Sequence, residues 1–186
     1  MCGRYAATAN PDELVEEFEI SFVDEEMAEV CRPRFNIAPT DTVAAVVERL
    51  KDDETTRKLV PLRWGLVPSW AKAPTATMIN ARVETVTQKP AFRKAASARR
   101  CLLPAIGYYE WRKEEVEGSA KPIKQPYFLS PEGGPLVMAG LYEFWKDPGL
   151  AGEGAWLTTC TIITTQATDA LGRIHDRMPM TVPPDA

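Results

Sequence analysis

The amino-acid sequence predicts an α+β fold built on a curled, mostly antiparallel β-sheet, open and barrel-like, with short helices at its flanks. Segments rich in β-branched and aromatic residues succeed one another closely in the second half of the chain, at residues 101–103, 106–111, 126–129, 136–145 and 156–164. Glycine, proline and charged stretches separate them, with few helical crossovers. Because short connections join antiparallel strands, whereas parallel strands need a crossover of about a dozen residues or more, this spacing favours an antiparallel sheet.

A chain of 186 residues has the size of one domain, and a domain of this length buries roughly 70% of its unfolded surface without needing a metal or a disulfide. We therefore expect residues 1–186 to form a single domain. No apolar run approaches the ~20 residues of a membrane span, and the chain does not open as a signal peptide does. The sequence predicts a soluble, cytoplasmic protein without a membrane partner.

The four cysteines are Cys2, Cys31, Cys101 and Cys160; they form no C-x-x-C pair, and the chain has one histidine. This composition disfavours a zinc site, so we expect no metal. Cys101 and Cys160 fall in apolar predicted strands, where a buried and unreactive thiol is the expected role.

The first predicted helix follows Asn10. Asn10 is a favourable N-cap, Pro11 suits the first helical position, and Glu13 completes a capping box. Leu14 and Phe18 then follow at helical spacing. The pattern indicates a short surface helix.

Extended structure is predicted after this helix. Prolines bracket residues 34–38 as an extended loop, and residues 42–48 are rich in β-branched side chains, as in a strand. We expect residues 59–64 to pair with that strand across a charged turn at 51–54. Residues 90–100 predict a basic amphipathic helix.

Charge is distributed unevenly along the chain. The net charge is −4 and the pI is about 5.2, which on average disfavours a nucleic-acid-binding protein. Residues 12–29 hold nine acidic residues and no basic one, whereas residues 82–113 hold eight basic residues against two acidic ones. The basic segment can supply a local phosphate-binding face, or it is a solvated helix surface.

Cys2 directly follows the initiator methionine. Because its side chain is small, we expect Met1 to be removed, which leaves one residue with both a thiol and a free α-amine. An α-amine titrates near ~8 and a thiol near ~8.5, so a fraction of each is nucleophilic at neutral pH. Such a residue adds to an aldehyde through its amine and closes a five-membered thiazolidine ring through its sulfur. The alternative is a disordered terminus, although residues 3–7 look like the start of a strand.

Trp64 and Trp70 flank a turn that contains glycine and proline. The two rings cannot pack there as a helical stripe. Exposed, they would form a platform on which unpaired bases stack. Packing in the core is the alternative.

Three further segments carry polar groups beyond what folding requires. Asn80 and Arg82 follow an apolar pair, an arrangement suited to orienting a ligand and holding a phosphate; otherwise Asn80 caps a helix. Glu110 lies among aromatic residues, which disfavours its charged form and suits proton transfer near neutrality, unless it pairs with an arginine. His175 is the only histidine, and imidazole suits proton transfer at pH 7, although a lone histidine is more often structural.

Six segments taken together, in this order along the chain, resemble the SRAP family, the SOS-response-associated peptidase-like proteins. They are Met1-Cys2-Gly3-Arg4-Tyr5, Arg34-Phe35-Asn36-Ile37-Ala38-Pro39, Arg63-Trp64-Gly65-Leu66-Val67-Pro68, Ile79-Asn80-Ala81-Arg82-Val83-Glu84-Thr85, Gly107-Tyr108-Tyr109-Glu110-Trp111 and His175-Asp176-Arg177-Met178-Pro179. The resemblance is spread from residue 1 to about residue 182 and is far more specific than any single motif.

The resemblance implies a DNA-repair protein that senses abasic sites in single-stranded DNA. Its N-terminal cysteine captures the ring-opened deoxyribose aldehyde as a stable thiazolidine crosslink, without a cofactor. The family's catalytic residues correspond to Cys2, Asn80, Glu110 and His175. Its DNA-contacting arginines correspond to Arg4 and Arg82, and the loop from Trp64 to Trp70 is similar to the wedge that separates duplex from single strand.

Family members usually continue beyond the histidine motif, whereas this chain stops at Ala186. We therefore expect the single SRAP-like domain to lack its C-terminal segment. We also expect a monomer that is cytoplasmic and associates with the bacterial nucleoid when bound to DNA.

Two other functions use the same residues. A peptidase or amidohydrolase would use Cys2 as an N-terminal nucleophile, His175 as the base and Asn80 in an oxyanion hole. A noncovalent nucleic-acid-binding module would bind DNA in a salt-sensitive manner without Cys2.

Overall fold

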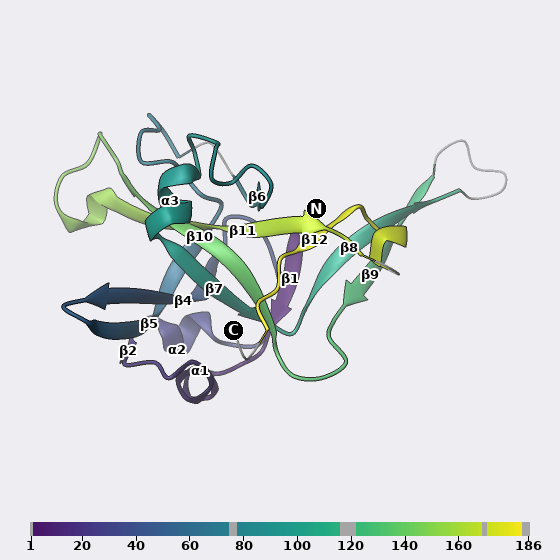
Figure 1. Ribbon diagram of the computed structural model, residues 1–186, viewed down its shortest axis with the longest axis horizontal. Coiled ribbons are helices and arrows are strands. Elements are labelled where there is room, and N and C mark those ends of the chain that lie inside the picture. The colour runs from purple at the N-terminus through teal and green to yellow at the C-terminus, as the bar shows by residue number, and fades with distance from the viewer. Residues whose placement is uncertain (1, 75–77, 116–121, 169–170, 184–186) are drawn as a thin grey trace.

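The computed structural model describes residues 2–74, 78–115, 122–168 and 171–183 (Figure 1). It confirms the predicted α+β class, since most elements are strands and the helices are few and short. The helices are α1 (Pro11–Phe18), α2 (Met27–Val30) and α3 (Arg93–Ala98), with short 3-10 helices at Glu153–Ala155 and Leu171–Arg173. The strands are β1 (Arg4–Ala7), β2 (Phe22–Val23), β3 (Arg34–Ile37), β4 (Thr42–Lys51), β5 (Glu54–Trp64), β6 (Asn80–Arg82), β7 (Arg100–Ala105), β8 (Gly107–Glu114), β9 (Ile123–Leu129), β10 (Leu136–Lys146), β11 (Trp156–Gln166) and β12 (Arg177–Pro179).

Five strands close into a barrel. Antiparallel pairs join them in the order β11, β10, β7, β4 and β5, and a parallel pairing of β5 with β11 completes the ring. The ring closes where Arg63 and Trp64 face Thr159 and Cys160. Its interior is a buried cluster to which every barrel strand contributes, including Val43, Leu62, Leu103, Met138 and Ile162. The sheet was predicted to be open, whereas the observed sheet is closed. The closing pair is β5 with β11, and the sequence of neither strand indicates the other as its partner.

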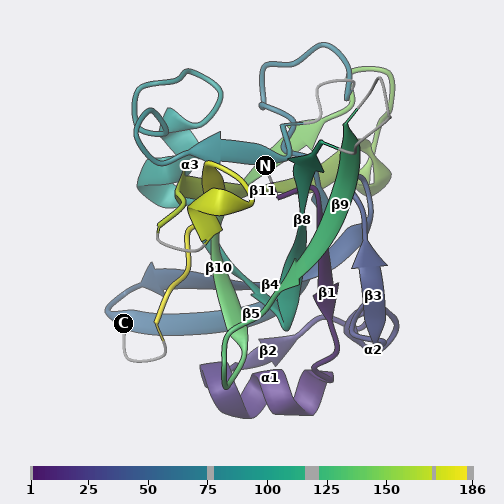
Figure 2. The same cartoon turned by 90° about the vertical axis from the view of Figure 1, so that its right-hand side faces the viewer.

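A second sheet lies against the barrel in the order β3, β1, β8 and β9, all antiparallel. The N-terminal strand β1 is therefore an interior strand, hydrogen-bonded on both edges. β8 and β9 extend away from the barrel on the right of Figure 1, and Figure 2 shows β1 running beside them. Because β1 begins at Arg4, its start places Cys2 where the second sheet meets the barrel.

The helices cover the outside of the barrel. α1 begins as predicted: the Glu13 N–H donates to the Asn10 side chain at 3.0 Å, and the Asn10 N–H donates to the Glu13 carboxylate at 3.1 Å. α1 and α2 pack on β4 and β5 through Leu14 and Met27, whereas α3 packs on β10 and β7 at the other side of the barrel. Among the described residues, no helix is long and apolar enough to cross a membrane.

The predicted hairpin between residues 42 and 64 is also confirmed. β4 and β5 pair from Thr42 opposite Arg63 to the turn. Asp52 and Asp53 form that turn with φ of 52° and 62°. Both central residues of a tight type I′ hairpin turn need positive φ, which aspartate tolerates. The predicted helix at 90–100 is shorter, because residues from Arg100 onward join the barrel as β7.

Leu103 tests how much of the stability depends on the barrel interior. Its side chain is 1% exposed inside the ring, so Leu103→Ala leaves a cavity and should lower the free energy of unfolding by about 2–5 kcal/mol. Leu50→Ala, at a side chain 69% exposed near the β4–β5 turn, is the matched control and should change it by about 0.5 kcal/mol or less. Urea denaturation measures both, and equal midpoints for the two variants would contradict a packed barrel core.

Candidate active site

Cys2 lies in the core rather than in a disordered terminus. Its side chain is 0% exposed and belongs to the barrel cluster, together with Tyr5, Trp64 and Cys160. The neighbouring strand explains this position, because β1 pairs with both β3 and β8 and draws the residues before it against the barrel. The N-terminal segment is therefore a structural part of the site.

Asn80 holds the backbone of Cys2. Its Nδ2 donates a hydrogen bond to the Cys2 carbonyl oxygen at 2.9 Å. Asn80 is the first residue of β6, which pairs in parallel with β11 opposite Ile162, so the alternative that it caps a helix is wrong. Its Oδ1 is buried and has no hydrogen-bond partner among the described residues. A buried acceptor without a donor is costly, and this oxygen is therefore available for a donor group of a ligand.

Glu110 lies beside Cys2 on β8. Arg4 faces Tyr109 across the antiparallel pair β1–β8, and this register carries the residues before Arg4 alongside Glu110 and Trp111. The Glu110 side chain is 3% exposed. Burial first, and the nearby Glu110 carboxylate second, raise the pKa of the Cys2 thiol to about 12. The thiol of the folded protein is therefore protonated at neutral pH.

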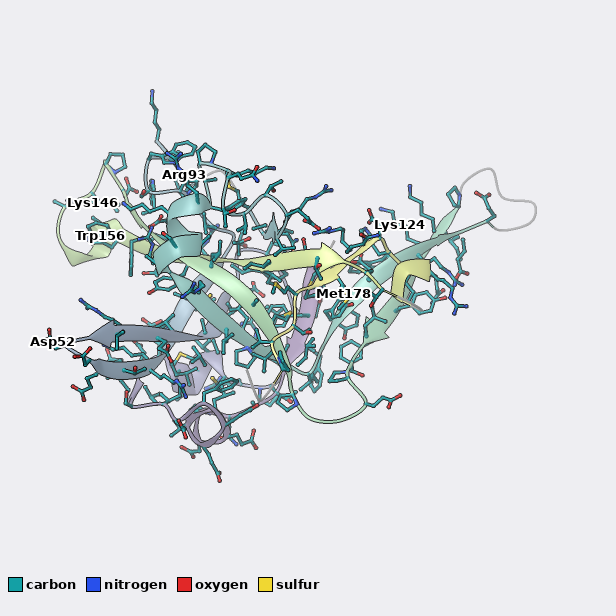
Figure 3. All side chains as sticks on the ribbon, in the orientation of Figure 1. Asp52, Arg93, Lys124, Lys146, Trp156 and Met178 are labelled. Atoms are coloured by element: carbon teal, nitrogen blue, oxygen red, sulfur yellow. The ribbon has the colours of Figure 1, made fainter. Side chains whose placement is uncertain are left out.

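His175 faces the same cavity as Glu110. These two residues line a hollow of about 430 Å³ together with Trp111, Lys113 and Lys124; Figure 3 labels Lys124 on β9, close to the C-terminal part of the chain. The structure thus brings all four predicted catalytic residues to one region: Asn80 contacts Cys2, Glu110 lies near its thiol, and His175 shares the cavity of Glu110.

The His175 Nδ1 atom has two neighbours that require different protonation states. It is 2.9 Å from the Arg177 N–H and 2.9 Å from Asp176 Oδ1. An unprotonated Nδ1 accepts from the Arg177 N–H, whereas a protonated Nδ1 donates to Asp176. Either tautomer of the ring has a partner in place, so these contacts fix the orientation of the imidazole.

Arg177 joins two of the segments that carry the family resemblance. Its guanidinium forms a bidentate ion pair with the Glu84 carboxylate, at 2.6 and 3.0 Å. It also donates a hydrogen bond to the Thr164 carbonyl oxygen at 2.6 Å. The pair fixes β12 and the residues after β6 to opposite edges of the same end of β11. Sequence reasoning did not select either residue as functional, although both lie in the quoted motifs. The opposite charges of Glu84 and Arg177 could have suggested an ion pair. The two residues lie far apart in the sequence, so the charges alone do not indicate that they meet.

The predicted DNA-binding residues differ in exposure. Arg82 is exposed on β6, whereas Arg4 is half-buried and its Nε donates to Asn36 Oδ1 at 3.1 Å. Trp70 is 66% exposed, but Trp64 is 0% exposed and its Nε1 donates to the Ile79 carbonyl at 3.0 Å. The prediction left core packing and base stacking open for the two tryptophans; Trp64 is a core residue, and only Trp70 has an available ring face.

The basic segment divides between two places in the fold. Lys89, Arg93 and Lys94 are exposed on and before α3, and Figure 3 labels Arg93 there. Lys113 lies on β8 and lines the cavity of Glu110 and His175. A positive charge at the cavity and a basic surface beyond β6 are both suited to a polyanion.

Comparisons with known proteins identify the family of this chain. The family model described as SOS response associated peptidase (SRAP) matches residues 1–186, and the chain belongs to this family. It is 38% identical over 184 residues to the abasic site processing protein YoqW of Bacillus subtilis, covering 97% of this chain and 75% of that protein. It is 28% identical over 218 residues to the abasic site processing protein HMCES of Xenopus tropicalis, covering 96% of this chain and 62% of that protein. A crystal structure of a protein from Bacteroides thetaiotaomicron has the same fold, with a TM-score of 0.78 at 24% identity over 98% of this chain and 77% of that one.

The ion pair of Glu84 with Arg177 should make stability depend on pH. Hydrogen bonding to Arg177 lowers the pKa of Glu84 in the folded protein. The pair therefore stabilises the fold above the unfolded-state value of about 4.3, and this contribution is lost as the pH falls through the lower folded-state pKa. Glu84→Gln should lower the free energy of unfolding at pH 7, and the difference from the parent should shrink below about pH 4.

Urea denaturation at a series of pH values measures this difference. Glu16→Gln, at an exposed carboxylate on α1, is the control and should show little change at any pH. A destabilisation by Glu84→Gln that is constant from pH 7 to pH 3 would mean that the carboxylate charge does not contribute.

Proposed function

We propose that this protein binds single-stranded DNA, or a junction of single and double strands, and crosslinks covalently to abasic sites through Cys2. The observation that carries the proposal is the placement of Cys2 just before β1, with its carbonyl held by Asn80 and its thiol near Glu110. The printed names of the relatives, abasic site processing proteins, support this substrate. The protein acts as a soluble, cytoplasmic monomer that joins the nucleoid when it is bound to DNA.

The chemistry begins with removal of Met1, since a nitrogen in a peptide bond cannot form an imine. The free Cys2 amine adds to C1′ of the ring-opened sugar, and loss of one water gives the imine. The Cys2 sulfur then adds to the imine carbon, and the thiol proton ends on the nitrogen, which closes the thiazolidine ring. One water molecule is the only product released.

The raised pKa of the Cys2 thiol favours this order of steps. A protonated, buried sulfur does not compete with the amine for the aldehyde, and it does not react with other electrophiles while the site is empty. Once the imine forms, the ring carbon lies within reach of the sulfur of the same residue, so the second step is intramolecular and fast. Glu110 or His175 assists the opening of the sugar and the proton transfers, as their shared cavity allows.

The remaining residues hold the DNA. The buried Oδ1 of Asn80 accepts a hydrogen bond from the sugar or from the attacking amine. Arg4 and Arg82 contact the flanking phosphates and so keep the aldehyde near Cys2.

A denaturing gel of the purified protein with abasic single-stranded DNA tests the proposal. Protein without Met1 should give a heat-stable adduct of one protein per strand. Cys2→Ser keeps an amine that forms an imine, but a hydroxyl closes the ring poorly, so its adduct should be labile to heat. Heat-stable crosslinks from Cys2→Ser, or efficient crosslinking by protein shown by mass spectrometry to retain Met1, would refute the mechanism.

The family description includes the word peptidase, which keeps an N-terminal-nucleophile hydrolase as the second candidate. Cys2 would attack an amide, with His175 as base and Asn80 in the oxyanion hole. A hydrolase turns over many substrate molecules, whereas the crosslinker is consumed one for one. A purely noncovalent binder would retain its affinity and give no adduct with or without Cys2.

Arg82 should contribute to DNA affinity at every sequence, because a phosphate contact carries no base information. Arg82→Gln should weaken binding uniformly and reduce the slope of log K against log salt by roughly 0.7 for single-stranded DNA. Arg4→Gln should do the same. Arg49→Gln, at an exposed arginine on β4, is the charge-matched control, and a slope for Arg82→Gln equal to that of this control would place Arg82 away from the DNA backbone.

The rates should identify the groups that move protons. Glu110→Gln and His175→Ala should each lower the single-turnover crosslinking rate by about 10². DNA affinity should change little, because neither residue is assigned to phosphate. Rates within a factor of about two of the parent at every pH would reduce both residues to a structural role.

A further inference from the structure

The exposed ring of Trp70 sits on a turn that is tied to the barrel at both ends. The Ala71 N–H donates to the Pro68 carbonyl at 2.9 Å and closes the turn. At the start of the segment, the Gly65 N–H donates to the Cys160 carbonyl at 2.8 Å, and Leu66 forms a bridge with Met78. The backbone of the barrel thus fixes the segment up to Leu66.

Two buried side chains fix the rest of the segment. Thr159 on β11 is 0% exposed, and its Oγ1 accepts from the Val67 N–H at 3.0 Å. Trp145 on β10 is 3% exposed, and its Nε1 donates to the Ala71 carbonyl at 2.7 Å. Trp145 thus anchors the residue directly after Trp70 to the barrel.

The buried indole N–H of Trp145 depends on the position of the turn, because the turn supplies its hydrogen-bond acceptor. A buried N–H without an acceptor costs the full desolvation of that group. The acceptor here is the carbonyl of the residue directly after Trp70. The turn cannot move away from the barrel rim without leaving the Trp145 N–H unpaired. A large exposed ring on a turn held in this way is a preorganised stacking surface, which loses little conformational freedom on binding.

We propose that Trp145, supported by Thr159, is a positioning residue that holds the Trp70 ring where it stacks on a base next to the abasic nucleotide. The inference rests on the proposed function and adds to it the means by which the flanking base is engaged. Trp145 touches neither DNA nor the reacting atoms; it acts through the turn alone. Its contribution therefore exists only while the Trp70 ring is present.

A double-mutant cycle tests this dependence. Trp70→Ala should weaken binding of abasic single-stranded DNA roughly 5- to 100-fold, the range for the loss of one base-aromatic stack. Trp145→Phe keeps an aromatic ring in the core but removes the N–H, and it should weaken binding roughly 3- to 10-fold when Trp70 is present. In the Trp70→Ala background, Trp145→Phe should have no further effect. Equal weakening by Trp145→Phe in both backgrounds would overturn the proposal.

A fluorescent base supplies a readout that a general loss of stability does not move. 2-Aminopurine placed beside the abasic site is quenched when an aromatic ring stacks on it. Quenching should fall in Trp70→Ala and in Trp145→Phe, and also in Thr159→Val, which leaves the Val67 N–H without its acceptor. Trp156→Phe, at a tryptophan 55% exposed on β11, is the matched control and should quench as the parent does. Parent-like quenching by Trp145→Phe and Thr159→Val would overturn the proposal.

The outcomes separate this inference from the proposed function. The crosslinking rate of Trp145→Phe at saturating DNA should stay within about twofold of the parent, because Cys2, Asn80 and Glu110 lie on other elements. A parent that crosslinks abasic DNA while Trp70→Ala binds it normally would refute the positioning role alone. A parent that forms no crosslink, but whose quenching depends on Trp70 and Trp145, would refute the crosslinking function and uphold the stacking turn. Urea denaturation confirms that each variant is folded at the assay temperature.

Discussion

Strand β11 pairs with four other strands, and these pairings position Asn80 and the segment that carries His175, whereas β1 and β8 of the second sheet position Cys2 and Glu110. Its antiparallel pairing with β10 and its parallel pairing with β5 close the barrel. Its parallel pairing with β6 places Asn80 opposite Ile162 and so within reach of the Cys2 carbonyl. Its pairing with β12 brings Arg177 to Thr164 and Glu84, and holds the segment that carries His175. Glu84 and Arg177, more than 90 positions apart in the sequence, meet because β6 and β12 both pair with β11.

The Cys2 thiol is buried, although the proposed reaction uses it as a nucleophile. A cysteine nucleophile is usually activated by a lowered pKa, whereas burial and Glu110 raise the pKa of Cys2. A site that works by imine formation does not need a thiolate at the start, because the amine of the same residue makes the first bond. The protonated sulfur is then a latent partner for ring closure. This division of labour explains how the thiol can lie in the core while the protein remains competent for the proposed crosslink.

The most acidic segment of the chain and the basic helix α3 lie on different sides of the barrel. The acidic residues of the segment 12–29 lie on and around α1 and α2 at the bottom of Figure 1, whereas α3 and its basic side chains lie on the opposite side of the barrel. Figure 2 shows the same separation from the side. A field of this kind orients a polyanion even when the net charge is negative. The local distribution of charge is therefore a better indicator of DNA binding than the overall pI.

Local features of the sequence were sufficient where neighbours along the chain supply the stabilisation. The capping box at Asn10 and the hairpin between residues 42 and 64 satisfy their backbone groups locally, so their patterns predicted them. The three-residue strands β6 and β12 have no such signal, because they exist only by pairing with β11. The sequence by itself determined the α+β class, the longer strands from β4 onward and the reactive potential of Cys2. Only the tertiary structure decided that Trp64 is buried while Trp70 is exposed, and that Asn80 holds Cys2, because burial and long-range pairing depend on which strands close the barrel.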